Sequence, residues 1–328
     1  MKVLITGGAG FIGSNFVRYM LEKYPDYKII NVDKLTYAGN PENVKDLSDR
    51  HIPIFGEQAD ICNIQSLNNI FQQYTPDYVV HFAAESHVDN SIDDSSAFIK
   101  TNVLGTENML KLSLKYGVKK YVQISTDEVY GSLTLEDRES VETDALKPRS
   151  PYSASKTAGD LLALAYHETH KLPILLTRCS NNFGPYQHPE KLIPKFITNL
   201  IQGKKVPLMG EGENIRDWLH VYDHCSAIDT VLHNGLIGET YNIGANNEIN
   251  NKNITLRLLK SFNFGEDMIQ PIEHRKGHDF RYAINSQKIK GIGWQQKYTN
   301  FDEALQQTID WYKANGAWWQ PLLKDVKY

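Results

Sequence analysis

The chain has 328 residues, enough for one large domain or two modest ones with a sizeable core. Hydrophobic residues make up 41% and charged residues 23%, and the formal charge of −4 gives no electrostatic reason to expect a nucleic acid or an anionic membrane as partner. No apolar run is long enough to cross a bilayer, and the start of the chain is not typical of a signal peptide, so we expect a cytoplasmic protein.

The first half of the chain alternates short apolar runs with amphipathic stretches. These patterns predict strands at residues 2–6, 28–32, 78–82, 121–125 and 174–178, and helices at residues 11–22, 102–116 and 153–170. Such alternation is typical of βαβ units. The sequence therefore predicts an α/β fold, a Rossmann-type doubly wound parallel sheet covered by helices on both faces.

After about residue 178 turn residues become dense and the alternation irregular, which predicts a smaller second domain. We expect residues 1–178 to form a dinucleotide-binding domain, joined by about 219–245 because residues 241–244 resemble a core strand. The substrate-binding domain is expected at about 179–218 and 246–328. The aromatic residues near the end are expected to pack as a helix and tail: Trp311, Tyr312, Trp318 and Trp319.

A glycine pattern follows the first predicted strand. Gly7, Gly10 and Gly13 permit a tight turn and a close approach of the backbone to a pyrophosphate, and the next helix supplies free N–H groups. Asp33 ends the second predicted strand, where a carboxylate can accept hydrogen bonds from ribose hydroxyls and repel a 2′-phosphate. Lys34 is next to it and softens that repulsion. The pattern favours NAD over NADP.

Tyr152 and Lys156 stand four residues apart on a predicted helix and share a face. A free phenol has a pKa of about 10, but an ammonium and a positively charged nicotinamide both favour the phenolate. The pair therefore suits removal of a proton from an alcohol during hydride transfer. By itself this spacing also occurs on ordinary helix surfaces.

The fourth strand ends in a hydroxyl pair and two acids. Ser125 and Thr126 lie where ligands bind in open α/β sheets, and Asp127 and Glu128 come directly after them. Adjacent acids are usually a solvated turn. Beside a hydride-transfer site, one neutral acid and one carboxylate can instead act as an acid/base pair.

These motifs resemble those of a known family. Residues 6–13 and the Tyr152/Lys156 pair are similar to the extended short-chain dehydrogenase/reductase superfamily. The segments at residues 83–89, 125–131, 178–187, 189–194 and 216–219 are similar to its dTDP-glucose 4,6-dehydratase branch. The resemblance reaches from the first strand to about Tyr282, and the later segments are more specific than the glycine pattern.

The resemblance implies a role for each catalytic candidate. Tyr152 takes the proton of the C4 hydroxyl while hydride leaves C4, Lys156 holds the nicotinamide ribose, and Thr126 bonds the C4 oxygen. Glu128 then removes the C5 proton, Asp127 protonates the departing C6 hydroxyl, and the hydride returns to C6. The net reaction is loss of water, and NAD is regenerated.

The resemblance also implies binding residues and an assembly. The substrate would be dTDP-glucose, and helices at residues 102–116 and 153–170 would form a homodimer. The residues expected to bind NAD are Gly7, Gly10, Phe11, Ile12, Gly13, Asp33, Lys34, Thr36, Asp60, Ile61, Ala83, Ala84, Ser86, Asn102, Tyr152, Lys156, Cys179 and Asn182. Those expected to bind the sugar nucleotide are Ser86, His87, Thr126, Asn181, Lys191, Leu192, Pro207, Arg216, Asn251, Arg275, His278 and Tyr282.

Three other readings stay open at this point. A sugar-nucleotide 4-epimerase would use the same cofactor and the same Tyr/Lys pair without needing the two acids. The substrate of a dehydratase could carry UDP, CDP or GDP, since Asn90 and Met209 depart from the family pattern. A non-catalytic NAD sensor could also have this fold. Three widely separated cysteines (Cys62, Cys179, Cys225) predict neither a metal site nor a disulfide framework.

Overall fold

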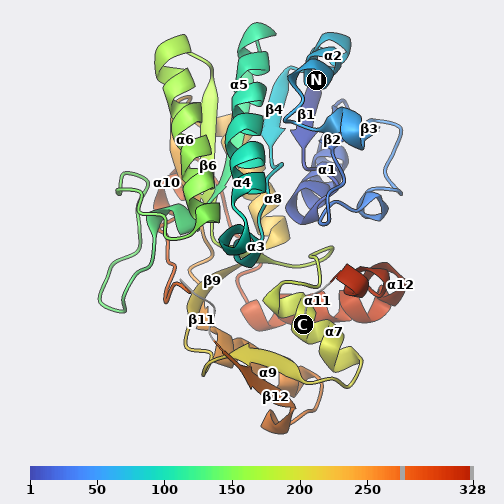
Figure 1. The fold of residues 1–328 in the computed structure, drawn as a ribbon, viewed down its shortest axis with the longest axis vertical. Coiled ribbons are helices and arrows are strands. Elements are labelled where there is room, and N and C mark those ends of the chain that lie inside the picture. Colours follow the sequence, from blue (N-terminus) through green and yellow to red (C-terminus); the bar gives the residue numbers. More distant parts are fainter. Residues whose placement is uncertain (274–277, 326–328) are drawn as a thin grey trace.

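A parallel sheet forms the larger part of the molecule, and a smaller unit lies below it (Figure 1). The structure, a computed structural model, describes residues 1–273 and 278–325. The sheet has the order β10-β6-β5-β4-β1-β2-β3, and every neighbouring pair is parallel. Its strands are β1 (Lys2–Thr6), β2 (Lys28–Asp33), β3 (His51–Phe55), β4 (Tyr78–His81), β5 (Lys120–Thr126), β6 (Ile174–Cys179) and β10 (Thr240–Ile243).

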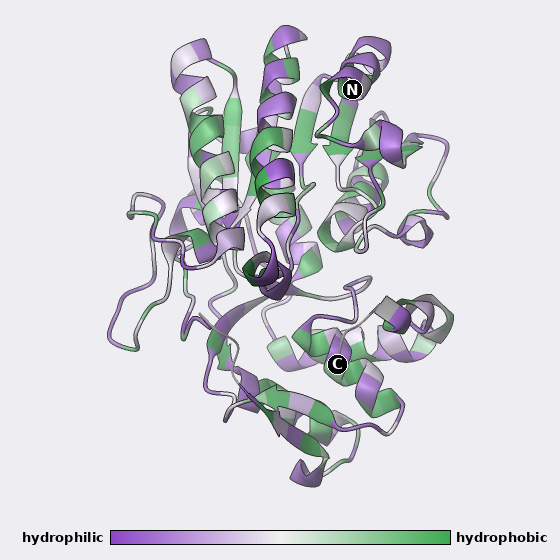
Figure 2. Ribbon diagram, viewed as in Figure 1, coloured by the Kyte–Doolittle hydropathy of each residue, from purple (hydrophilic) through white to green (hydrophobic). Residues whose placement is uncertain are grey.

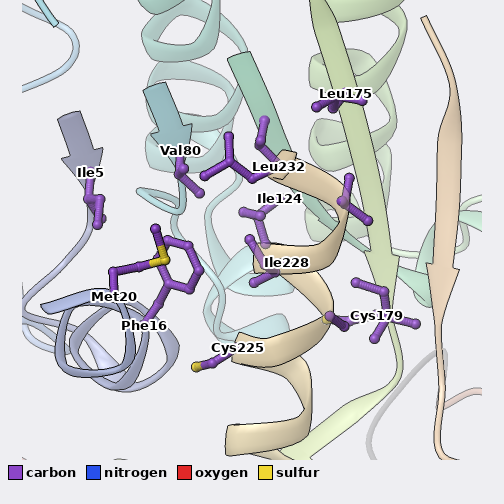
Figure 3. Close-up of a cluster of buried hydrophobic side chains, with 14 of the residues drawn as sticks. Ile5, Phe16, Met20, Val80, Ile124, Leu175, Cys179, Cys225, Ile228 and Leu232 are labelled. Atoms are coloured by element: carbon purple, nitrogen blue, oxygen red, sulfur yellow. The ribbon is translucent and has the colours of Figure 1, made fainter. Parts of the chain in front are cut away.

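Helices cover both faces of this sheet, as the sequence predicts for a doubly wound fold. One face carries α1 (Phe11–Lys23), α8 (Val221–Asn234) and α10 (Gln287–Gly291), and the other carries α2 (Ile64–Tyr74), α5 (Thr106–Lys115) and α6 (Pro151–His170). Phe16 and Met20 of α1 and Ile228 of α8 point at the strands (Figure 3). The strands are mostly hydrophobic in Figure 2, because a parallel sheet is buried on both faces.

The smaller unit has its own core around Phe183, Phe196, Trp218 and Tyr312. Two small sheets, β11-β9-β7 and β12-β8, support it. The chain enters it after β6, returns to the large sheet through α8 and β10, leaves again, and returns once more at α10 before α11. Its elements are β7 (Asn181–Phe183), α7 (Leu192–Ile201), β8 (Val206–Met209), β9 (Ile215–His220), β11 (Glu248–Asn250), α9 (Asn251–Ser261), η5 (Glu266–Met268), β12 (Ile269–Ile272), α11 (Phe301–Ala314), α12 (Gly316–Trp319) and η6 (Pro321–Asp325).

Short helical segments occupy connections around the sheet. They are η1 (Pro41–Asn43), η2 (Glu57–Ala59), α3 (Val88–Asp93), α4 (Ser96–Phe98), η3 (Ile99–Gly105) and η4 (Asp127–Tyr130). The helix expected at residues 102–116 starts earlier, as the π-helical η3, and becomes α-helical only at Thr106. Within residues 1–273 and 278–325, no helix is both long and apolar enough to span a membrane.

Candidate active site

A cleft of about 540 Å³ lies at the carboxyl ends of the strands, and residues of both units line it. All five predicted catalytic residues line it, and so does every predicted cofactor residue except Asn102. Of the residues expected to bind the sugar nucleotide, the cleft is lined by Ser86, Thr126, Asn181 and Lys191.

The glycine turn leaves no room for a side chain at Gly7 or Gly13. Gly7 has a φ of +72°, and a Cβ on Gly13 would lie 2.2 Å from the Gly7 carbonyl oxygen. Helix α1 has no side-chain cap at Gly10 and no acidic residue in its first turn. Its first N–H groups and partial positive charge therefore suit an anion such as a pyrophosphate.

Asp33 and Lys34, at the end of β2, determine the charge next to the glycine turn. The Asp33 carboxylate accepts N–H bonds from Ala9 (2.9 Å) and Leu35 (2.8 Å), and burial nevertheless raises its pKa. The Lys34 ammonium lies 2.8 Å from an Asp60 carboxylate oxygen. Because Asp60 already pairs with Lys34, the Asp33 charge is not neutralised by its neighbour, which opposes a 2′-phosphate.

Helix α6 begins in a way that fixes Tyr152 in its first turn. Ser150 and Ser153 form a capping box and Pro151 occupies the first turn. The Tyr152 N–H donates to the Ser91 hydroxyl at 3.2 Å. One turn later, the Lys156 ammonium donates to the Ile124 carbonyl at 2.7 Å, and burial lowers its pKa.

The sequence predicts that nearby charges lower the pKa of Tyr152. In the protein without cofactor the surroundings raise it instead. Burial, followed by the charge of Glu128, raises the pKa of the phenol well above its usual value. The hydrogen bond with Thr126 acts in the opposite direction on this pKa but does not reverse the rise. A positive charge brought to this cleft by a cofactor would therefore favour the phenolate.

The surroundings of Asp127 favour the neutral form of its carboxyl group. Thr126 ends β5 and caps η4, accepting the Glu128 N–H and donating to Asp127 Oδ1, both at 3.3 Å. Asp127 is only 3% exposed, and burial, followed by the charges of Glu128 and Asp217, raises its pKa well above the usual 3.8. Its Oδ2 has no hydrogen-bond partner in the described part of the chain. A protonated carboxyl group in this cleft can donate to a ligand.

A buried polar network ties η4 to α6. The Arg178 Nε lies 3.0 Å from Asp160 Oδ2, and its Nη1 donates to the Tyr130 hydroxyl at 2.9 Å. The Tyr130 hydroxyl donates in turn to Asn242 Oδ1 at 2.8 Å. The turn that carries Asp127 is thus held against the helix that carries Tyr152.

Arg216 and Tyr282 lie next to η4 without lining the cleft. The Arg216 guanidinium lies 4.4 Å from the Tyr282 ring centroid and donates to the Asp279 carbonyl at 2.9 Å. Its charge opposes the rise of the Asp127 pKa, and Glu128, after burial, raises the pKa of Tyr282. These couplings place both side chains close to the acid pair.

The remaining predicted residues stand apart from the cleft lining. Asn102 is buried and bonds both backbone groups of Glu85 and the Ser155 hydroxyl. The His87 Nε2 lies 3.7 Å from a Glu190 carboxylate oxygen. Arg275 falls outside the described residues. The others lie outside the residues that line the cleft: Leu192, Pro207, Asn251 and His278.

The sequence reasoning missed several cleft residues. Glu85 and Glu190 line it, directly beside the predicted Ser86 and Lys191, and Lys100 lines it from η3. No spacing or turn pattern marks them, and only their neighbours along the chain point to them. Within the described residues, no group of three or more His, Cys, Asp or Glu side chains is placed to hold a metal ion.

Comparison with known proteins assigns the chain to a family. The family model described as GDP-mannose 4,6 dehydratase matches residues 4–308. A dTDP-glucose 4,6-dehydratase of Streptomyces antibioticus is 48% identical, with 99% of this chain and 96% of that protein covered.

Two solved structures agree with this assignment. The dTDP-glucose 4,6-dehydratase of Bacillus anthracis in complex with NAD is 50% identical, has a TM-score of 0.90, and covers 98% of this chain and 99% of its own. The enzyme of the same name from Streptomyces venezuelae, also with NAD bound, is 45% identical with a TM-score of 0.93, covering 98% and 100%. The chain belongs to the dTDP-glucose 4,6-dehydratase family of extended short-chain dehydrogenase/reductases.

Proposed function

We propose that this protein removes water from dTDP-glucose, using catalytic NAD, and forms dTDP-4-keto-6-deoxyglucose. One observation carries the proposal: Asp127 and Glu128 line the same cleft as Tyr152 and Lys156. Oxidation of an alcohol needs only the second pair, whereas elimination across C5 and C6 needs an additional base and acid. Relatives of this name, 44–48% identical over nearly their full length, support it.

The cleft fits the cofactor. The glycine turn leaves its N–H groups to the pyrophosphate, and Asp33 is placed for the adenosine ribose. NAD, when bound, supplies the acceptor and later the donor of one hydride. The positive charge of the oxidised cofactor would add to that of Lys156 in favouring the Tyr152 phenolate.

The first half of the reaction belongs to Tyr152, Thr126 and Lys156. The Thr126 hydroxyl holds the C4 oxygen of the sugar, and Tyr152 takes the C4 hydroxyl proton as that carbon is oxidised. Lys156 is buried and fixed by the Ile124 carbonyl, so it orients the cofactor ribose. The resulting 4-keto group acidifies the C5–H bond.

The second half belongs to the acid pair. Glu128 takes the C5 proton, and the protonated Asp127 gives its proton to the C6 hydroxyl, which leaves as water. The C5–C6 double bond is then reduced by hydride at C6 and by a proton that Glu128, in exchange with solvent, returns to C5. Tyr152 releases its proton to solvent and Asp127 regains one from it, which restores both groups. Each proton taken from the sugar thus has a named acceptor, and the leaving group has a named donor.

Incubation with dTDP-glucose in deuterated water tests this proposal. We expect a product with an alkali-sensitive keto chromophore that carries deuterium at C5. A product that retains hydrogen at C5 contradicts the role of Glu128, and no turnover despite tight NAD binding favours the sensor reading. A parallel screen of UDP-, CDP- and GDP-hexoses measures the base specificity.

The Asp127→Asn/Glu128→Gln double variant separates dehydration from epimerisation. We expect dehydration to fall by about 10³-fold or more, since a positioned acid or base contributes roughly 10²–10⁴-fold. The exposed Asp137→Asn is the matched control and should retain full turnover. A double variant that interconverts C4 epimers at an undiminished rate identifies an epimerase instead.

The binding mode and the assembly are further parts of the proposal. Lys191 at the cleft wall, together with Arg216 and His278, would bind the diphosphate and sugar. A homodimer through η3, α5 and α6 is supported by apolar side chains that this surface leaves open: Ile99 is 52% exposed, Leu104 44% and Leu161 55%. Segments η3 and α6 are in contact, so these side chains belong to one surface. The cytoplasm is the proposed location.

A further inference from the structure

Helix α12, near the end of the chain, is hydrogen-bonded to a side chain of η1 that in turn holds the cofactor turn. The Trp318 indole N–H donates to Asn43 Oδ1 at 2.7 Å, across 275 positions of the chain. Trp318 lies beyond residues 4–308, the part matched by the family model. None of the residues that line the cleft belongs to α12.

Asn43 is 2% exposed, and its polar groups are engaged. Its side-chain amide donates to the Ala9 carbonyl at 2.8 Å, and its own carbonyl accepts from Arg18 Nη2 at 2.6 Å. Its N–H donates to the Asn40 carbonyl at 3.0 Å. Because the amide nitrogen faces Ala9, the oxygen must face Trp318, so the indole N–H fixes the amide orientation.

Ala9 is the residue through which this contact acts on the cofactor turn. It lies between Gly7 and Gly10, and its carbonyl accepts from both Asn43 and the Asn40 N–H. Its own N–H donates to Asp33 Oδ2 at 2.9 Å. A continuous row of hydrogen bonds therefore joins Trp318, Asn43, Ala9 and Asp33, and Gly7, Gly10 and Asp33 line the cleft.

An aromatic cluster holds the Trp318 side chain. Its ring lies 5.1 Å from that of Trp311 and 5.7 Å from that of Tyr186, centroid to centroid. The Arg18 guanidinium lies 4.9 Å from the Tyr186 ring centroid. The same arginine donates to the Asn43 carbonyl, so the cluster and the hydrogen-bond row support each other.

We propose that Trp318 and Asn43 are positioning residues for the cofactor turn, and that the C-terminal segment thereby retains NAD between turnovers. The inference rests on the proposed function, in which one NAD serves many cycles and its loss would stop them. Loss of the indole N–H leaves a buried amide oxygen without its donor and frees the amide that holds Ala9. The glycine turn is then held less firmly, and its N–H groups bind a pyrophosphate less tightly.

Trp318→Phe tests this, because it keeps a smaller aromatic ring in the cluster and removes the indole N–H. We expect the purified variant to lose NAD on dialysis and to need a three- to tenfold higher NAD concentration for half-maximal turnover. Added NAD should restore kcat, with the KM for dTDP-glucose unchanged. Trp294→Phe is the control: it loses an equivalent bond to the Ser226 hydroxyl (3.0 Å) remote from the cleft and should retain NAD.

Asn43→Leu removes the amide itself and should weaken NAD retention more than Trp318→Phe does. Hydrogen exchange of the unaltered protein needs no variant to fold: NAD should slow amide exchange in α12 as well as in the glycine turn, because coupling is reciprocal. Unaltered protein that binds no NAD overturns the proposed function. Unaltered protein that binds NAD, with Trp318→Phe retaining it equally and α12 exchange unchanged, overturns this inference alone.

Discussion

Burial raises the pKa values of two acidic groups in the cleft, the Asp127 carboxyl group and the Tyr152 phenol. Burial and the neighbouring Glu128 charge raise the pKa of Asp127 well above its usual value and favour its neutral form, and the same causes raise the pKa of Tyr152. A neutral carboxyl group suits a donor to the C6 hydroxyl. A neutral phenol suits a group that loses its proton only when the cofactor's charge is beside it.

The pH dependence of stability should report the burial of Asp127. Its folded pKa is raised above 3.8, so the folded state binds more protons than the unfolded state, and the free energy of unfolding falls as pH rises through the folded pKa. Asp127→Asn removes this loss. We expect the variant to be more stable than the unaltered protein at pH 8 by about 1 kcal/mol, with no difference below about pH 4.

Thermal or urea unfolding at pH 4 and pH 8 measures this effect. Asp137 provides the opposite case, because the Thr134 N–H lowers its pKa and Asn at this exposed position should bring no gain at pH 8. Equal stability of Asp127→Asn and the unaltered protein at pH 8 would mean that ionisation of Asp127 does not lower the free energy of unfolding.

At the scale of elements, the junction between β1 and α1 is a place where even a small added side chain cannot be accommodated. The Gly13 position meets the Gly7 carbonyl, so a methyl group there must displace α1 from the turn or open the turn itself. Either change moves the N–H groups that a pyrophosphate would contact. Such a change should weaken cofactor binding more than core packing, because the core residues Phe16 and Met20 lie further along the helix.

Gly13→Ala should therefore abolish measurable NAD binding or weaken it by at least about 100-fold, the loss of roughly 2.7 kcal/mol. Gly291→Ala is the control, since a Cβ there meets nothing within 4 Å. Calorimetric titration with NAD gives the two affinities. Tight binding by Gly13→Ala would show that the turn adapts more easily than its geometry indicates.

The elements that sequence predicted are those whose pattern is local. The strand at residues 2–6 and the start of a helix at Phe11 have clear apolar periods. Strand β3, an edge strand with Pro53 in its middle and little burial, carries no such pattern and was missed. The Trp318–Asn43 bond was also beyond prediction, because tertiary packing alone joins two residues 275 positions apart.

At the scale of the whole molecule, the surface of η3 and α6 is the place where a second copy is proposed to bind. Leu104 and Leu161 are large, apolar and half exposed, and such side chains cluster in homodimer interfaces. Segments η3 and α6 also carry residues of the cleft, but neither Leu104 nor Leu161 lines it. Assembly and catalysis can thus be tested separately.

Leu104→Arg/Leu161→Arg should convert a dimer to monomers, because two buried guanidinium groups per protomer would lack partners. Sedimentation velocity measures the change. Leu236→Arg is the control, since Leu236 is 66% exposed in the loop after α8 and should leave the assembly intact. Unaltered protein that sediments as a monomer would contradict the proposed homodimer.

The position of β10 beside β6 has a consequence for biosynthesis. The outer edge of β6 is complete only when residues 240–243 pair with it, yet the whole span from β7 to α8 must be made first. A nascent chain that has emerged as far as β6 therefore carries an unpaired hydrophobic strand edge, the kind of surface that misassembles or recruits chaperones. Ribosome pausing within that span would prolong the vulnerable interval.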